Sequence, residues 1–110
     1  MYGGWNNAQD IETALQKVTD LSLPLIVGEF GYNFDKGNNN LKCTADPSTI
    51  LRKCQELGIG YIPWSWAGNN KENAWLELSD WDNLTWWGKE VFEGDNGISK
   101  TEKKASVFLK

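Results

Sequence analysis

Two short, mainly apolar segments lie in the middle of the chain, and a helix pattern separates them. They are residues 23–27 and residues 59–66. Continuous apolar runs of this length are typical of strands in a parallel sheet covered on both faces. Between them, Asp46 is placed to cap a helix, Pro47 to occupy its first position and Gly58 to end it. Because strand, helix and strand in this order form a βαβ unit, the sequence predicts an α/β fold with parallel strands.

The flanking segments are predicted to be helices and loops. Amphipathic spacing and capping residues indicate three further helices, at residues 7–20, 84–92 and 99–108. The last of these begins with a capping-box pattern formed by Ser99 and Glu102. Turn-forming and polar residues predict loops at residues 1–7, 32–45 and 67–83.

Charge and hydrophobicity exclude several classes of partner. The chain has 110 residues, 11 of them basic and 15 acidic, and a formal net charge of −4. No cluster of Lys and Arg interleaves with aromatic residues, so we expect no nucleic-acid partner. The longest apolar run is far too short to span a bilayer, and no signal peptide is visible in this chain. We therefore expect no membrane association.

The counts of histidine and cysteine limit the kinds of catalytic and metal site that the chain can form. Histidine is absent, which excludes His-based triads and His-ligated zinc and leaves carboxylates as the main candidates for proton transfer. Cys43 and Cys54 are too few for a disulfide framework or a four-cysteine metal site. They either form one disulfide or remain two free thiols. We expect neither a metal nor another cofactor.

Glu29 occupies the most informative position for chemistry. It follows the first apolar segment directly, with Gly28 before it and Phe30 after it. In parallel α/β proteins, active sites are assembled where the strands end. A carboxylate at this position either forms an ion pair, hydrogen-bonds to the structure or reacts with a substrate.

The chain has seven tryptophans, and two of them end the second apolar segment. Side chains alternate along a strand, so Trp64 and Trp66 are expected to share one face and Ser65 to take the other. Indoles at this edge of a parallel sheet either fill the core or form a surface on which sugar rings stack.

Together these residues resemble a known enzyme family. Residues 23–31 resemble the signature of the seventh strand in glycoside hydrolase family 5, a family of retaining endo-glycanases. Residues 60–69 resemble the signature of the eighth strand in the bacterial β-mannanases of that family. The resemblance continues through Asp80 and Trp81 to residues 94–98 and so covers essentially the whole chain.

The resemblance implies a retaining mechanism and assigns its nucleophile. In such enzymes two carboxyl groups about 5 Å apart flank the scissile bond, one attacking the anomeric carbon and the other protonating the leaving oxygen. Glu29 corresponds to the nucleophile. Tyr2 corresponds to a tyrosine that hydrogen-bonds the nucleophile and helps to keep it ionised.

Four tryptophans are implied in substrate binding. Trp64 corresponds to the indole that forms the platform under the sugar being cleaved. Trp66 is either a further wall of the site or part of the core. Trp5 and Trp75 lie in loops beside the same edge and are candidate contacts of outer subsites.

The chain departs from the family pattern in two respects. The family's acid/base glutamate follows an asparagine at the end of the fourth strand, and nothing here corresponds to that strand. Ala67 stands where the mannanase pattern often has lysine. The resemblance therefore implies that residues 1–110 are the C-terminal fragment of a single (β/α)8 catalytic domain, which usually needs about 250 residues. Such a fragment is expected to be inactive alone and to associate with itself or with the missing part of the barrel.

Three functions remain open at this point. The first is hydrolysis of a β-1,4-linked polysaccharide, with mannan favoured and an extracellular parent enzyme implied. The second is hydrolysis of β-1,4-glucan by a cellulase-type enzyme of the same family. The third is a non-catalytic carbohydrate-binding or structural half-barrel, which would be favoured if aromatics lined a strand face without a carboxylate beside them.

Overall fold

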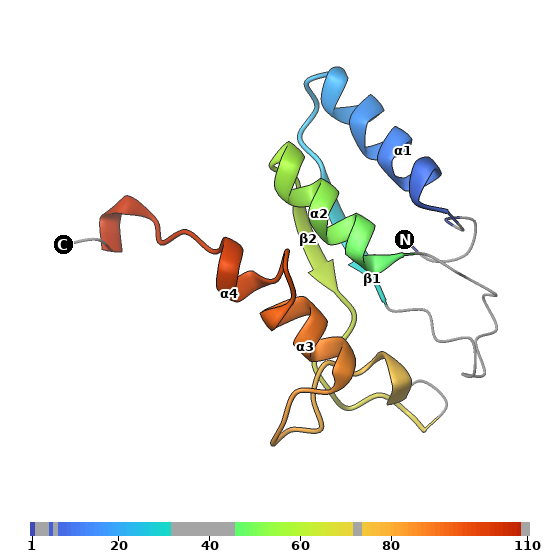
Figure 1. Ribbon diagram of the computed structural model, residues 1–110, viewed down its shortest axis with the longest axis vertical. Coiled ribbons are helices and arrows are strands. Elements are labelled where there is room, and N and C mark those ends of the chain that lie inside the picture. Colours follow the sequence, from blue (N-terminus) through green and yellow to red (C-terminus); the bar gives the residue numbers. More distant parts are fainter. Residues whose placement is uncertain (2–4, 6, 32–45, 72–73, 109–110) are drawn as a thin grey trace.

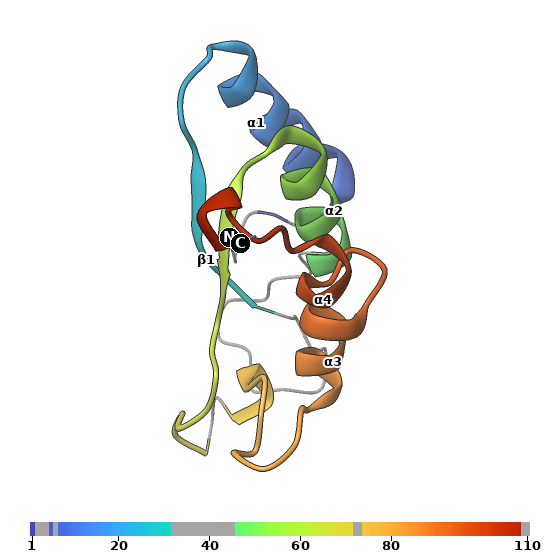
Figure 2. The ribbon, with the colours of Figure 1, turned by 90° about the vertical axis from the view of Figure 1, so that its left-hand side faces the viewer.

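The computed structural model describes residues 1, 5, 7–31, 46–71 and 74–108. The elements follow in the order α1 (Ala8–Asp20), β1 (Ile26–Phe30), α2 (Pro47–Leu57), β2 (Gly60–Pro63), the 3-10 helix η1 (Ala74–Leu76), α3 (Trp86–Glu93), α4 (Ile98–Thr101) and the 3-10 helix η2 (Ser106–Phe108). Helices α1, α2 and α3 lie on one side of the molecule, and the two strands lie on the other (Figures 1 and 2).

Strands β1 and β2 pair in parallel, which confirms the predicted α/β class with parallel strands. The register places Ile26 opposite Gly60 and Phe30 opposite Pro63, with an irregularity between Val27 and Phe30. Strand β1 therefore uses one residue more than β2 over the same length. Such a bulge changes the direction of the side chains around it and is common next to active sites.

The bounds of both strands differ from those predicted. Strand β1 begins at Ile26 and runs to Phe30, so it lies later than residues 23–27. Strand β2 ends at Pro63 instead of residue 66, because the backbone then changes partner. The Ser65 N–H donates to the carbonyl oxygen of Leu76 at 3.0 Å, and the N–H of Leu78 donates to the carbonyl oxygen of Ser65 at 2.7 Å.

The first two helices confirm the capping pattern. The side chain of Asn7 accepts a hydrogen bond from the N–H of Asp10 at 2.8 Å at the start of α1. At the start of α2, Asp46 accepts from the N–H of Ser48 at 3.0 Å. Helix α2 ends at Gly58, whose φ of 66° lies in the left-handed region that glycine adopts most easily.

The C-terminal helices are only partly as predicted. Helix α3 is present, with the Thr85 side chain as its N-cap. The predicted helix over residues 99–108 is wrong: α4 has four residues, Glu102 is already extended, and η2 is a separate turn. Val107 and Phe108 are 65% and 76% exposed. A short helix gains its stability mainly by packing an apolar face, and η2 lies away from the other helices and strands (Figure 1).

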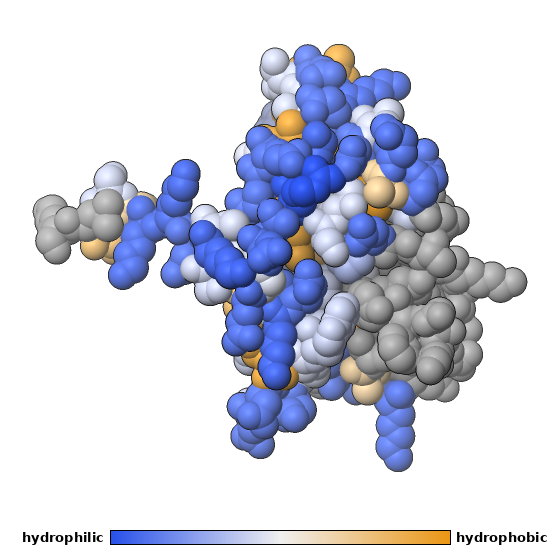
Figure 3. All heavy atoms as spheres, viewed as in Figure 1, coloured by the Kyte–Doolittle hydropathy of each residue, from blue (hydrophilic) through white to orange (hydrophobic). Residues whose placement is uncertain are grey.

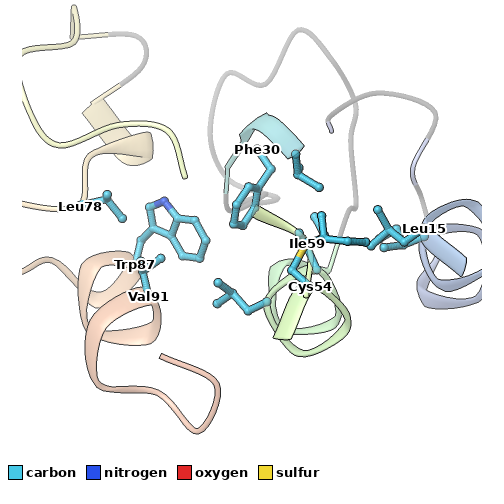
Figure 4. Close-up of a cluster of buried hydrophobic side chains, with 11 residues drawn as sticks. Leu15, Phe30, Cys54, Ile59, Leu78, Trp87 and Val91 are labelled. Carbon is cyan, nitrogen blue, oxygen red and sulfur yellow. The ribbon is translucent and has the colours of Figure 1, made fainter. Parts of the chain in front are cut away.

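The core lies between the helices and one face of the sheet. Phe30 of β1 and Trp87 of α3 meet edge to face, with ring centroids 5.9 Å apart (Figure 4). The buried apolar side chains of the cluster are Ile11, Leu15, Val27, Phe30, Ile50, Leu51, Cys54, Ile59, Leu78, Trp87 and Val91. One continuous core thus joins α1, α2 and α3 to the strands.

The other face of the sheet carries exposed apolar side chains. Ile26 of β1 is 57% exposed and Ile62 of β2 is 52% exposed. The opposite side of the molecule, where the helices face the viewer in Figure 3, is mostly hydrophilic. Parallel sheets are normally covered on both faces, so this apolar face is unusual for a soluble α/β fold.

Cys54 lies in the core as a free thiol, and Cys43 lies outside the described residues. The Cys54 side chain is 1% exposed, and its burial raises the pKa of the thiol to about 11. A buried thiol disfavours the charged thiolate, so Cys54 is an unreactive core residue in the folded chain.

The raised pKa of Cys54 predicts a loss of stability above pH 9. The unfolded thiol has a pKa of about 8.5 and releases its proton first, so rising pH favours the unfolded state until the folded thiol also ionises near pH 11. A shift of this size corresponds to about 3 kcal/mol. Urea unfolding at pH 8 and pH 10.5 should show an additional loss in the wild type that Cys54→Ala lacks. Equal losses in both proteins would contradict the prediction.

Candidate active site

Glu29 lies at the end of β1, where both strands finish. It is the next-to-last residue of β1, within the bulged part of the strand, and its side chain is exposed. Because β1 and β2 are parallel, the segment that follows β2 leaves the sheet at the same edge (Figure 1). Glu29 and the residues after Pro63 are therefore presented at one edge of the sheet.

An open hollow of about 310 Å³ runs along β1 and includes Glu29. Its other lining residues are Met1, Trp5, Ala14, Leu15, Val18, Leu25, Ile26, Val27 and Gly28. Trp5 and Glu29 thus line the same hollow. The amino group of Met1 donates a hydrogen bond to the backbone oxygen of Glu29. Tyr2, which the family resemblance implies as a hydrogen-bond partner of Glu29, lies outside the described residues.

The Glu29 carboxylate is not part of a structural ion pair within the described residues. The ion pairs found there join Arg52 to Glu12 and Glu56, Lys53 to Glu56, and Lys100 to Asp95. The hydrogen bond from Arg52 also lowers the pKa of Glu56. These carboxylates lie on helices or in the turn before α4, so the charged groups that stabilise the fold are separate from Glu29.

Trp64 is held next to Glu29 by the backbone. The Trp64 N–H donates to the carbonyl oxygen of Phe30, the residue after Glu29, at 2.7 Å. The carbonyl oxygen of Trp64 accepts from the indole N–H of buried Trp87 at 3.1 Å. The Trp64 ring is 41% exposed, and its own indole N–H donates to Oδ1 of Asn69 at 3.2 Å. Hydrogen bonds to its backbone and to its ring nitrogen thus hold the exposed Trp64 in place.

The predicted alternation of Trp64, Ser65 and Trp66 assumes a strand, but β2 ends at Pro63, and Trp64 and Trp66 are both exposed, at 41% and 49%. The Asn69 side chain that accepts from Trp64 also donates to Oγ of Ser65 at 2.5 Å, so both side chains reach one partner. Trp66 instead packs edge to face on Phe92 of α3, with centroids 6.0 Å apart. This contact covers part of the Trp66 ring and the residue is still 49% exposed, so both interpretations of Trp66 stay open.

Two residues of this site are not singled out by the sequence patterns. Asn69 looks like one of several polar loop residues, and Trp87 looks like an ordinary apolar position of an amphipathic helix. The structure shows that Asn69 orients the Trp64 ring and that Trp87 fixes the Trp64 backbone. Trp75 belongs to η1, but its side chain lies outside the described residues.

The described residues give no indication of a metal centre or a membrane span. Among them, no three carboxylate or thiol side chains are grouped in a way that would hold a metal ion. None of the described helices combines the length and the hydrophobicity needed to cross a bilayer.

Comparison with known proteins places these residues in an enzyme family. No family model matches the chain. Individual relatives do: the mannan endo-1,4-β-mannosidases of Streptomyces lividans and Salipaludibacillus agaradhaerens are 35% and 36% identical over 98% and 97% of this chain. The chain belongs to the family of the bacterial β-mannanases. It spans 27% and 33% of the length of these two relatives.

Solved structures of β-mannanases agree in fold as well as in sequence. The enzyme from Thermomonospora fusca is 40% identical, with a TM-score of 0.82 over 98% of this chain and 35% of its own length. The enzyme from Streptomyces thermolilacinus, solved with mannohexaose, is 36% identical with a TM-score of 0.82 over 100% of this chain and 35% of its own. This chain therefore corresponds to about one third of the length of these β-mannanases.

Proposed function

We propose that residues 1–110 form the C-terminal part of the (β/α)8 catalytic domain of a retaining endo-β-1,4-mannanase. In this proposal β1 and β2 are the seventh and eighth strands, and Glu29 is the nucleophile. One observation carries it: the parallel register and the Trp64–Phe30 hydrogen bond place an exposed carboxylate and an exposed indole at the same strand ends. This chain aligns with about one third of the length of several β-mannanases, which supports the proposal that it is one part of a larger catalytic domain.

The proposed reaction has two steps. The Glu29 carboxylate attacks the anomeric carbon, the glycosidic C–O bond breaks, and a second carboxyl group gives its proton to the leaving oxygen. That second group then takes a proton from water, and the water oxygen displaces Glu29 from the sugar. Tyr2 would hydrogen-bond the ionised Glu29. The acid/base group comes from strands outside these 110 residues.

The indoles give the proposed site its affinity for sugar. Pyranose rings present C–H faces that pack well on flat aromatic surfaces, and Trp64 offers an exposed ring held by Asn69. Trp5 shares the hollow with Glu29 and is proposed as an outer contact. Trp75 and Trp66 complete the proposed set, Trp66 with the smaller role because it packs on Phe92.

Mannan is the proposed substrate, and β-1,4-glucan is the second candidate. The mannanase relatives and the mannohexaose complex support mannan. A further relative, which is 34% identical over 92% of this chain, is the β-mannanase/endoglucanase A of Caldicellulosiruptor saccharolyticus. Its name combines both activities, and Ala67 departs from the mannanase pattern. Because such polysaccharides are too large to cross a membrane, we also propose that the enzyme acts outside the cell.

Covalent trapping tests the proposed nucleophile. A mannanase chimaera is made by placing this chain in the Thermomonospora fusca β-mannanase, in place of the third to which it aligns. A 2-deoxy-2-fluoro-β-mannosyl fluoride should leave its sugar attached to Glu29, because fluorine at C2 slows hydrolysis of the intermediate. Peptide mass spectrometry identifies the labelled residue. A label on another carboxylate, or hydrolysis of mannan without any label, would refute the assignment.

The isolated 110-residue chain is expected to lack normal activity. No residue of this sequence matches the family's acid/base glutamate, and acid/base catalysis typically contributes about 10²–10⁴-fold. Reducing-sugar release from mannan should therefore be at least about 100-fold slower than for the mannanase chimaera. Equal rates per molecule would show that the chain is catalytically complete.

The isolated chain is also expected to self-associate. Each strand has one neighbour within the described residues, and Ile26 and Ile62 expose apolar surface beside the open strand edges. Sedimentation velocity should show dimers or larger species at micromolar concentration. Ile62→Lys should shift the distribution towards monomer, whereas Lys103→Glu, an exposed change near the C-terminus, should not. A compact wild-type monomer would contradict the prediction.

A further inference from the structure

Trp81 lies at the tip of a short loop after η1, and no role follows for it from the proposed catalytic site. Ser79 and Leu84 form an isolated antiparallel bridge, and residues 80–83 connect them. The Trp81 side chain is 71% exposed, the largest exposure among the described tryptophans. Its φ is +78°, in the left-handed region that bulky side chains rarely adopt.

The loop holds this conformation through its own hydrogen bonds. The Trp81 N–H donates to Oγ of buried Ser79 at 3.0 Å. The carboxylate of Asp80 accepts from the N–H groups of Asp82 and Asn83 at 3.1 and 2.7 Å. The N–H of Asp80 donates to the carbonyl oxygen of Asn83 at 3.0 Å. Every backbone N–H in residues 80–83 is therefore bonded, and the indole is presented from a fixed backbone.

One part of the Trp81 ring lies against the loop that positions Trp64. A Cβ on Gly68 would be 3.8 Å from Cζ2 of Trp81. Gly68 directly precedes Asn69, whose side chain bonds the indole N–H of Trp64, and whose N–H donates to Oε1 of Glu77 at 2.7 Å. Gly68 and Asn69 thus link the two exposed indoles. The Trp81 ring lies near Gly68, and the Trp64 ring is hydrogen-bonded to Asn69.

This arrangement does not stabilise the fold by burial. An exposed indole in a left-handed backbone has neither a core contact nor a favoured conformation, and outliers of this kind are concentrated at binding sites. A fixed aromatic ring loses little conformational freedom when a ligand covers it. We propose that Trp81 is a second sugar-stacking platform, which binds a hexopyranose unit of a β-1,4-linked chain beyond the unit on Trp64. This inference rests on the proposed function and extends it to longer substrates.

Two variants separate the effect of the Trp81 ring from the effect of its backbone conformation. Trp81→Gly removes the indole and suits the left-handed φ, so its melting temperature should not fall. Trp81→Phe keeps a ring. The 110-residue chain, labelled with ¹⁵N in its tryptophan indoles, is titrated with mannohexaose and followed by NMR. We expect the Trp64 and Trp81 indole signals to shift with one Kd and the signal of buried Trp87 to stay in place.

The variants give the deciding comparison. Trp81→Gly should raise the Kd about tenfold, Trp81→Phe by less, and the exposed control Trp86→Ala should leave it unchanged. Loss of binding in Trp64→Ala with no change in Trp81→Gly would overturn this inference and leave the proposed function standing. No change in either variant would overturn both.

A second measurement uses catalysis in the mannanase chimaera. Trp81→Gly should raise KM for mannohexaose about tenfold, with a smaller effect on kcat and on mannotriose, which has fewer sugar units available beyond the one on Trp64. An equal rise for both substrates would show that Trp81 does not bind a distant sugar unit, and would overturn the inference.

Discussion

Glu29→Gln in the mannanase chimaera should lower kcat for mannan by about 10⁴–10⁶-fold, as expected when the nucleophile of a covalent mechanism is removed. Glutamine has almost the same shape as glutamate, but its amide cannot attack the anomeric carbon. The fold should be unaffected, because the Glu29 side chain is exposed and makes no ion pair within the described residues. The loss should therefore appear without a change in melting temperature.

Two further variants distinguish a nucleophile from a merely charged neighbour. Glu29→Asp keeps the carboxylate but withdraws it by one methylene, and a displacement of about 1 Å typically costs about 100-fold in rate. Glu29→Ala leaves space for a small anion, so added azide should restore turnover and yield an α-mannosyl azide. An acid/base residue treated in this way would give the β-azide instead.

Matched controls complete this experiment. Glu93→Gln changes an exposed glutamate at the end of α3, far along the chain from the strand ends, and should leave kcat within about twofold of the unsubstituted chimaera. Initial rates on mannan and on a β-1,4-glucan are measured for each protein. Retention of more than about one tenth of the rate by Glu29→Gln would rule out a nucleophilic role.

The sequence predicts the elements whose signals are local. Helix α2 is an example, because Asp46, Pro47 and Gly58 each act within one turn of the helix end that they define. The parallel pairing also follows, because the two apolar runs are separated by a helix long enough to cross over. The edge at which Glu29 lies depends only on this topology, so it too is predictable.

Features that depend on pairing or packing are not predictable in this way. The bounds of β1 and its bulge depend on which residues of β2 lie opposite, and no local pattern sets that register. The capping-box pattern at Ser99 fails because the Ser99 Oγ donates to the carbonyl oxygen of Phe92 at 2.5 Å. A tertiary hydrogen bond thus replaces the local one on which the prediction relied.

The role of Asn69 shows the same limit within the site. Asparagine in a loop is usually read as a turn residue. Here one amide side chain joins the indole N–H of Trp64 to the hydroxyl of Ser65. Only the placement of the residues after Pro63 reveals this contact.

Trp87→Ala should lower the free energy of unfolding of the 110-residue chain by about 3–5 kcal/mol, the largest stability effect that we expect from a single side chain. The Trp87 side chain is 2% exposed and packs edge to face on Phe30. Its indole N–H also satisfies the carbonyl oxygen of Trp64. Removing the ring therefore leaves a cavity in the core, and it leaves the carbonyl oxygen of Trp64 without the indole N–H donor.

Trp87→Phe separates these two effects. Phenylalanine keeps most of the contact with Phe30 but cannot donate to the Trp64 oxygen, so its cost should be smaller, about 1–3 kcal/mol. The adjacent Trp86 is 60% exposed, and Trp86→Ala should cost about 1 kcal/mol or less. Urea unfolding at one protein concentration measures all three, since self-association would otherwise shift the midpoints.

The order of these costs tests how the candidate site is built into the fold. If Trp87 supports both the residue after Glu29 and the backbone of Trp64, then Trp87→Ala must be the most destabilising of the three changes. In the mannanase chimaera, Trp87→Phe should also lower kcat/KM more than Trp86→Ala does, because a released Trp64 carbonyl lets the sugar platform move. Equal midpoints for Trp87→Ala and Trp86→Ala would show that the two rings contribute alike, and that the edge carrying Glu29 and Trp64 is held by other contacts.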